Sequence, residues 1–200
     1  MKKVIKSDSI VLSGTTLKIN GNNKQGCFVE ILDRVKSQMD AMLSHHCQIL
    51  VIRLDLRMYE YHENNEMLSR FVRKVRKKLK AKYSFARVGF VWVREMEKAK
   101  HQHYHFALLL DANKVRYPVK ILTICSTIWE NWGQSPYTPK NCYYHIKRGD
   151  SAAYQSAFKR LSYLAKERGK GYKGKTANDY GNSRIKPKPP ELTSQVQEQQ

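Results

Sequence analysis

The sequence predicts an α+β domain: a four- to five-stranded antiparallel sheet with helices packed on it and an extra helix on the N-terminal side. Segments with apolar residues at every second position, typical of strands, occur between segments with apolar residues at helical spacing. Between the first and the last helix their order is β-α-β-β-α-β, which forms an antiparallel sheet with its helices on one face. The 200 residues are 41% hydrophobic, enough for one globular core.

The N-terminal part is expected to be a polar lead-in followed by a helix and a strand. Residues 1–24 are polar, and we expect them to be flexible. From Phe28 to Leu43 apolar residues recur every three or four positions, which predicts a helix. Residues 49–57 alternate as a strand does. One predicted face carries Leu50, Ile52, Leu54 and Leu56, and the other carries Arg53, Asp55 and Arg57.

The middle of the chain predicts a basic helix and a hairpin. The pattern of residues 64–82 is helical, with one apolar face. Its opposite face carries only positive charge, from Arg70, Arg73, Lys74, Arg76, Lys77, Lys78 and Lys80. Residues 87–97 form a predicted strand, 98–100 a short connection, and the apolar run from His101 a second strand.

The last third predicts two helices around a short strand. Helices are expected over 117–132 and 150–168, a loop over 133–139 and a strand over 142–147. Asp150 is a good N-cap and Gly169 a good helix stop. We therefore expect one domain over residues 25–175, followed by a mobile basic, Pro- and Gln-rich tail over 176–200.

The charge favours a nucleic-acid partner. Lys and Arg number 37 against 17 Asp and Glu, a net charge of +20 that attracts phosphate backbones. No apolar run approaches the roughly 20 residues that span a bilayer, and the N-terminus lacks the apolar stretch of a signal peptide. We expect a cytoplasmic protein with no membrane partner. The four cysteines form no C-x-x-C pair, so they are expected to be small buried residues.

Three histidines at alternate positions predict a metal site. In a strand, His101, His103 and His105 point to the same side. The preceding strand ends with Glu95 and Glu97, which a tight hairpin can place beside them. Two imidazoles and a carboxylate suit Mn²⁺ or Mg²⁺ with open positions for phosphate oxygens. Asp55 is a rival carboxylate, unless it pairs with a neighbouring arginine.

Tyr163 is the candidate nucleophile. On a helical wheel it lies about 180° from Tyr154 and so outside the apolar stripe, which makes Tyr154 a core residue. Its neighbours at helical spacing are Lys159 and Lys166. A tyrosine among lysines has the surroundings that attack on a phosphate requires. The plain alternative is a surface tyrosine beside lysines.

Further basic residues are candidate DNA contacts. The stretch from Lys166 to Lys188 has a net charge of +6, and the helix over 64–82 presents a one-signed face. Such charges hold the DNA backbone without reading its sequence. The selected DNA-binding residues are Arg53, Arg57, Arg73, Lys77, Lys159, Lys170 and Lys173.

Several segments together resemble the HUH endonucleases, which include rolling-circle replication initiators and relaxases. His103-Tyr104-His105 fits the His-hydrophobe-His element and Tyr163-Leu-Ala-Lys166 fits the Tyr-x-x-Lys element. More narrowly, Arg53-Leu-Asp-Leu, Trp92-Val-Arg-Glu95 and the histidine strand look like the inovirus-type replication proteins of phages and prophages (YagK/YfjJ-like). The similarity spans about residues 45–185.

The resemblance implies an RRM-like HUH fold and a mechanism. His103 and His105 would hold the metal with Glu95, with Glu97 in reserve and His101 as a third histidine ligand. Tyr163 would attack single-stranded or hairpin DNA at a replication origin, giving a 5′-phosphotyrosine and a free 3′-OH. Lys166 would position the phosphate. The histidines precede the tyrosine, as in replication initiators, and a helicase and polymerase would come from the bacterial host.

Two other functions fit parts of the pattern. A non-catalytic phage or prophage regulator on the same fold would use the basic surface alone. A zinc hydrolase would use the three histidines, but the net charge and the lack of a general-base cluster argue against it. Tyr104 is larger than the aliphatic residue common at the middle of the HUH element. Only one tyrosine is well placed, which disfavours a two-tyrosine mechanism.

Overall fold

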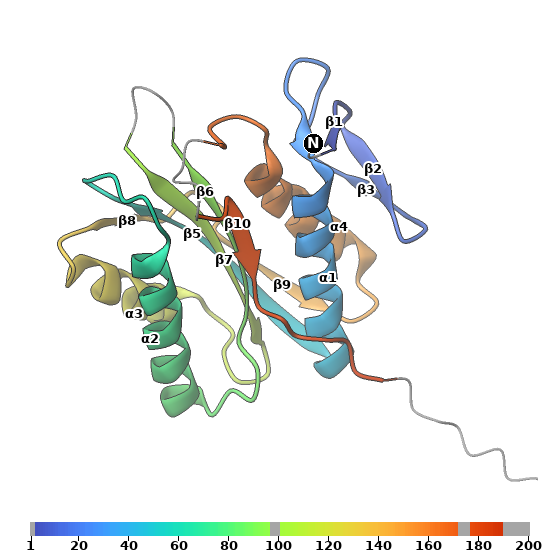
Figure 1. Cartoon of the computed structure of the whole chain (residues 1–200). Coiled ribbons are helices and arrows are strands. Elements are labelled where there is room, and N and C mark those ends of the chain that lie inside the picture. The colour runs from blue at the N-terminus through green and yellow to red at the C-terminus, as the bar shows by residue number, and fades with distance from the viewer. Residues whose placement is uncertain (1–2, 97–100, 172–176, 190–200) are drawn as a thin grey trace, which may run out of the picture.

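The computed structural model describes residues 3–96, 101–171 and 177–189. It is an α+β protein in which a mainly antiparallel sheet lies between two pairs of helices (Figure 1). Helices α2 (Glu66–Tyr83) and α3 (Val119–Glu130) cover one face. Helices α1 (Val29–His45) and α4 (Ser151–Leu161) cover the other. Within the described residues, no helix combines the length and apolar character needed to cross a membrane.

The sheet has six antiparallel strands rather than four or five. Its order is β10-β6-β7-β5-β8, and β9 also pairs with β5. The bounds are β5 (Gln48–Arg57), β6 (Gly89–Glu95), β7 (His103–Asp111), β8 (Ser135–Tyr137), β9 (Tyr143–Lys147) and β10 (Tyr180–Asn182). Strands β8 and β10 come from segments expected to be loop and tail. Short strands of two or three residues give almost no periodicity to detect.

Strand alternation divides the core into two layers. Leu50, Ile52, Leu54 and Leu56 face α2 and α3, as predicted, together with Phe106 and Leu108 of β7. The intervening residues, such as Val51 and Leu109, face α1 and α4. The two helices of the β-α-β-β-α-β series thus share a face, while the flanking helices cover the opposite one.

The N-terminal lead-in is not a loose segment in the structure. Strands β2 (Ser9–Leu12) and β3 (Thr15–Lys18) form a hairpin, while β1 (Val4–Ile5) pairs with β4 (Cys27–Phe28). Ser13 and Gly14 have φ angles of 48° and 74°, as a tight hairpin turn requires. Four apolar residues in or next to the hairpin are buried, namely Ile10, Leu12, Leu17 and Ile19, whereas Val11 is exposed. That burial orders a stretch whose composition is polar.

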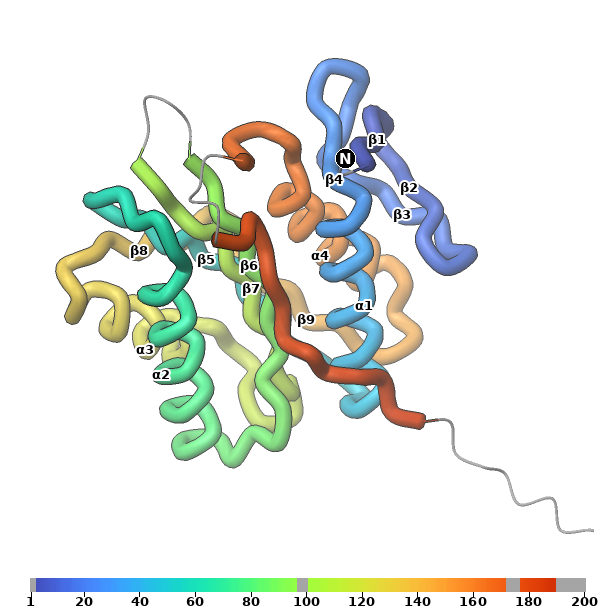
Figure 2. The backbone as a smooth tube through the Cα atoms, in the orientation of Figure 1, coloured from blue at the N-terminus to red at the C-terminus, as the bar shows by residue number. Residues whose placement is uncertain are grey.

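The described part of the tail is also ordered. Strand β10 pairs with β6, and the chain after it runs beside α1 (Figure 2). Gln38 donates a hydrogen bond to the carbonyl of Ile185 at 3.2 Å. Gly181 packs so closely on the indole of Trp92 that an added Cβ would lie 2.7 Å from the ring. Residues 172–176 and 190–200 lie outside the described residues.

The last helix ends earlier than predicted. Asp150 caps α4 as expected, with its side chain accepting from the Ala153 N–H at 2.9 Å. However, α4 stops at Leu161 and a 3-10 turn, η1 (Ser162–Ala165), follows. Lys166 is extended and forms a β-bridge with Cys27, which prevents further helix. Cys27 and Cys125 are buried, as predicted. Cys142 is only partly buried, and Cys47 is exposed because it lies in the bend before β5.

Candidate metal centre

Glu95, His103 and His105 converge at one end of the β6–β7 ladder. The register pairs Glu95 with His103 and places His105 two residues along the same face. The Glu95 Oε2 atom lies 3.1 Å from His105 Nε2 and 3.6 Å from His103 Nε2. One donor atom from each side chain lies within 4.8 Å of the others. The structure therefore brings together the two histidines and the carboxylate that were expected to hold a metal.

The donor set fits a divalent cation. His105 Nδ1 donates to Asp55 Oδ1 at 2.7 Å, and His103 Nδ1 donates to the carbonyl of His101 at 3.2 Å. An imidazole that donates through Nδ1 presents its lone pair at Nε2. In the neutral form that binds a metal, both rings would present these lone pairs toward Glu95 Oε2, so these three residues could hold a metal ion. In the protonated form each Nε2–H instead points to that carboxylate oxygen. The arrangement does not identify the ion.

The competing ligand candidates take other places. Asp55 lies opposite His105 in the β5–β7 ladder and orients that ring from the side away from Glu95. Burial raises the pKa of Asp55, but the hydrogen bond from His105 and the nearby positive charges outweigh it, so the pKa is lowered. His101 is exposed, and its backbone carbonyl accepts the hydrogen bond from His103 Nδ1. Glu97 lies outside the described residues.

Lys170 supports Glu95 from the other side. Its Nζ lies 2.5 Å from Glu95 Oε1 and also donates to the carbonyl of Lys166. Burial alone would raise the pKa of Glu95, but hydrogen bonds from both histidines and the Lys170 charge hold it well below its usual range. Lys170 was predicted to contact DNA phosphates, but its side chain is buried and paired with Glu95. Its polar partner lies 75 residues away, so sequence spacing gave no sign of this role.

Tyr163 lies against the same cluster. Its ring meets that of His105 edge-on, with centroids 5.2 Å apart. The Arg53 guanidinium carbon is 4.3 Å from the Tyr163 ring centre, and Lys166 Nζ is 4.9 Å from it. The predicted proximity of tyrosine, histidines and Lys166 is therefore present. The 3-10 turn, rather than a continued helix, gives Tyr163 this position.

A small pocket opens at this point. It measures about 40 Å³ and is lined by Gln25, Glu95, Tyr163, Lys166 and Arg168. One water needs about 10–15 Å³ measured in this way. The pocket could therefore take an ion with a phosphate oxygen, while the rest of a nucleotide would have to lie outside it.

The predicted DNA contacts are spread over the molecule. Arg53 is 4% exposed and lies between Asp55 and Tyr163, so it is not available to an external strand. Arg57 and Lys159 are exposed on the molecule's surface. Arg73 and Lys77 are exposed on α2, across the sheet from the cluster. Lys173 lies outside the described residues.

Arg94 is a structural residue that the sequence reasoning missed. It is 1% exposed, and the guanidinium donates hydrogen bonds to backbone carbonyl and side-chain amide oxygens. They include the backbone oxygens of His62 at 2.5 Å and Asn64 at 3.2 Å and the side chain of Gln102 at 3.1 Å. Arg94 thereby fixes the loop after β5, next to the cluster. The sequence signal that could have revealed this role is a charged residue at a strand position that faces the core.

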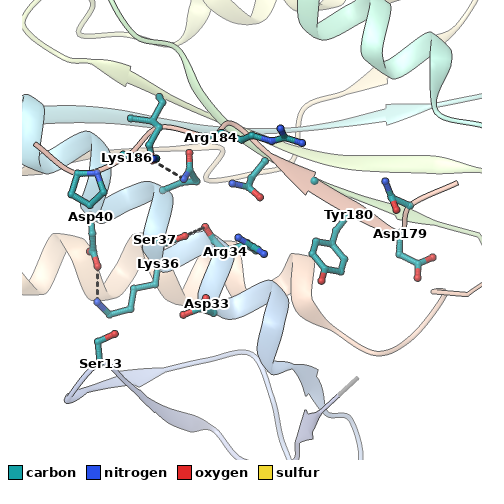
Figure 3. Close-up of a pocket in the computed structure, with 16 residues that line it drawn as sticks. Ser13, Asp33, Arg34, Lys36, Ser37, Asp40, Asp179, Tyr180, Arg184 and Lys186 are labelled. Carbon is teal, nitrogen blue, oxygen red and sulfur yellow. Dashed lines mark hydrogen bonds and ion pairs between the residues drawn. The ribbon is translucent and has the colours of Figure 1, made fainter. Parts of the chain in front are cut away.

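A larger cavity lies elsewhere. It measures about 950 Å³ and lies between α1 and residues 178–187 (Figure 3). Its charged lining mixes signs, with Asp33 and Asp40 beside Arg34 and Arg184, and Asp40 is paired with Lys36 at 2.6 Å. No residue of the Glu95–His103–His105 cluster lines it. Because its charges offset one another and it holds no comparable donor set, the cluster is the stronger functional candidate.

Comparisons with known proteins give one match. The model of the YagK/YfjJ C-terminal domain family matches residues 14–183, from the start of β3 to the end of β10. No match was found among the curated proteins or among the solved structures. The matched span contains the whole metal cluster and Tyr163.

Proposed function

The chain belongs to the YagK/YfjJ C-terminal domain family, and we propose that it is a HUH-type endonuclease that nicks and rejoins single-stranded DNA. One observation carries the proposal: the Tyr163 ring lies 5.2 Å from His105, within the only His/Glu cluster of metal-site geometry among the described residues. The order β5-α2-β6-β7-α3-β9 is compatible with the RRM-like arrangement of that superfamily.

The residues around Tyr163 suit a phosphodiester substrate. Glu95, His103 and His105 would hold Mn²⁺ or Mg²⁺, and a metal there supplies Lewis-acid polarisation of a phosphate oxygen. Asp55 and Lys170 fix the orientations of His105 and Glu95. Lys166 adds positive charge beside the Tyr163 ring, where the phosphate's negative charge must be accommodated.

The reaction is a transesterification. The Tyr163 hydroxyl oxygen attacks phosphorus and forms a phosphotyrosine bond, while the bond from phosphorus to the 3′ oxygen breaks. The phenolic proton is lost and the leaving 3′ oxygen gains one, so no other reactant is consumed. Reversal of the same step by a 3′-OH rejoins the strand. One tyrosine is sufficient for this cycle.

The biological role that follows is initiation of rolling-circle replication of a phage or mobile element. The net charge of +20 would draw an origin strand to the protein. The free 3′-OH would prime synthesis by a host polymerase after a host helicase opened the duplex. This places the activity in the cytoplasm of a bacterial cell.

An adduct assay tests the proposal. Labelled single-stranded oligonucleotides that tile the surrounding replicon are incubated with the protein and Mn²⁺, and SDS-resistant protein–DNA adducts are sought. We expect an adduct that chelation and Tyr163→Phe abolish. Tyr154→Phe is the matched control, because the Tyr154 hydroxyl bonds Asp40 at 2.6 Å, away from the cluster.

Two results would count against it. An adduct that survives Tyr163→Phe would remove the assigned nucleophile. Tight DNA binding without any adduct, unchanged by His103→Ala or His105→Ala, would favour a non-catalytic DNA-binding regulator instead.

A further inference from the structure

We propose that Arg57 and Tyr137 form a stacking subsite for one unpaired base beside the scissile phosphate. This inference rests on the proposed function and deepens it, because it assigns a place on the protein to the nucleotide next to the reacting one. The ligand class is an unpaired nucleobase with its phosphate.

The sheet register places the pair next to the metal cluster. In β5, Arg57 lies opposite His103 and Asp55 lies opposite His105. Strand β8 pairs on the other side of β5, with Tyr137 opposite Asp55. Residues opposite each other in an antiparallel ladder point to the same face. Arg57 and Tyr137 therefore share a face with both histidines.

The spacing suits adjacent groups of one DNA strand. Neighbouring strands are about 4.8 Å apart, so Tyr137 lies two strands, or about 10 Å, from His105. Arg57 is one strand from His103. If a phosphate binds at the cluster, the next nucleotide of the same strand would lie within reach of the Arg57 guanidinium and the Tyr137 ring.

The chemistry of the pair suits a base. The Arg57 guanidinium carbon lies 4.3 Å from the Tyr137 ring centre, which holds the ring in one orientation. Both members of this pair are exposed, Tyr137 at 43%. In the other arginine–tyrosine pair on this face, formed by Arg53 and Tyr163, the arginine is 4% exposed. An exposed, oriented ring with a positive charge beside it is the combination that binds single strands without reading sequence.

The chain supplies a matched control for this ring. Tyr143 is also 43% exposed and also lies on a strand beside β5. It pairs with Ile52, whose side chain faces α2 and α3, so Tyr143 points to the opposite face. If exposure alone made a tyrosine bind DNA, the two would behave alike.

A double-mutant cycle between protein and DNA tests the subsite. Affinity is measured for a bound single-stranded oligonucleotide and for versions with one abasic position, scanned along it. With wild-type protein we expect one abasic position to weaken binding by about 5- to 150-fold, the range for loss of one stacked base. Tyr137→Ala should weaken binding of the intact strand similarly and add nothing at that position. Tyr137→Phe keeps the ring and should restore the loss at that abasic position, and Tyr143→Ala should bind as wild type does.

The outcomes separate this inference from the function it rests on. The subsite would be overturned if the loss of affinity from Tyr137→Ala multiplied with the loss at every abasic position. An equal loss of affinity from Tyr143→Ala would overturn it too. In either case, continued adduct formation would leave the proposed nicking activity intact. A wild-type protein that binds no single strand and forms no adduct would overturn both. Thermal unfolding of each variant shows that it is folded.

Discussion

The two sides of β7 differ in what they contribute. Tyr104, Phe106 and Leu108 point into the apolar layer under α2 and α3, while His103 and His105 point to the opposite face and meet Glu95. Consecutive residues of one strand thus serve stability and chemistry in turn. The apolar side therefore fixes the backbone on which the donor atoms of the other side depend.

The two sides also differ in energetic character. Each large apolar side chain on the α2/α3 side stabilises the fold by about 1.5–3 kcal/mol through burial. The cluster side also buries the side chains of Asp55, Glu95 and Lys170. The cost of removing these charges from water is offset by the Glu95–Lys170 ion pair and by the hydrogen bonds of both carboxylates to His105. The cluster side is therefore expected to respond to a bound cation, and the apolar side to lost volume.

The neighbours His105 and Phe106 give the largest contrast. Phe106→Ala should lower the free energy of unfolding by about 3–5 kcal/mol, because it leaves a cavity between sheet and helices. It should keep the stabilisation by Mn²⁺, about 2.7 kcal/mol at a hundredfold excess over the dissociation constant. His105→Ala should lose that gain. Denaturant unfolding with and without Mn²⁺ measures both.

Phe106→Leu is the milder variant if Phe106→Ala does not fold. A metal gain that disappears in both Phe106 variants, or one that persists in His105→Ala, would break the division between the two sides.

Asp55→Asn should sharpen the comparison within the cluster side. The amide accepts the His105 hydrogen bond less strongly and carries no charge, so metal affinity should fall by about 10- to 100-fold. Calorimetric titration with Mn²⁺ measures it. Asp111→Asn is the control, since Asp111 lies on the same face of β7 at the far end of the ladder. Equal losses in the two variants would show a general charge effect.

The stabilisation by metal should depend on pH. Burial lowers the pKa of His105, but its bonds to Asp55 and Glu95 outweigh this, so the pKa is raised above 6.5. Without metal, protonated His105 stabilises the fold at low pH, and this contribution is lost as pH rises through the raised pKa. Metal competes with that proton. Below the raised pKa, Mn²⁺ affinity should fall by up to about tenfold per pH unit.

Melting curves with and without Mn²⁺ across the range from about pH 5.5 to about pH 8.5 measure this. A metal-induced shift that grows as pH falls would contradict it. His105→Ala should show no metal-induced shift at any pH in this range, because it has lost one of the three metal ligands.

The smallest effect is expected on α2. Arg73 and Lys77 lie across the sheet from the cluster, beyond the screening length of about 8 Å at physiological salt. Arg73→Ala with Lys77→Ala should change the affinity for a short single strand by less than about twofold. Lys166→Ala, beside Tyr163, should change it more. If the α2 variant instead lowered the salt dependence of DNA affinity by the equivalent of about two phosphate contacts, DNA would reach both faces of the sheet.

The sequence predicted the features that rest on long periodic segments. The alternation over residues 49–57 and in the histidine strand identified the central ladder and both of its faces. The histidine pair, Glu95, Tyr163 and Lys166 were selected from the sequence and lie together in the structure. The resemblance to HUH endonucleases contributed the choice of Glu95 and Lys166.

The features that escaped depend on contacts between distant segments. The strand β10 has only three residues, and pairing with β6 rather than its own pattern orders it. Lys170 and Arg53 were assigned to DNA because both are basic, yet the side chain of each is buried by partners that sequence spacing does not reveal. The 3-10 turn at Tyr163 depends on the bridge between Lys166 and Cys27, far apart in sequence.

Pairing of the C-terminal segment with β6 has a consequence for solubility. Without Tyr180, Gly181 and Asn182, the backbone N–H and C=O groups of Val91 and Val93 would form an open sheet margin flanked by apolar side chains. Open margins of this kind template intermolecular β-pairing and aggregation. The three residues of β10 therefore act as a covering that keeps one copy of the protein from joining its sheet to the next.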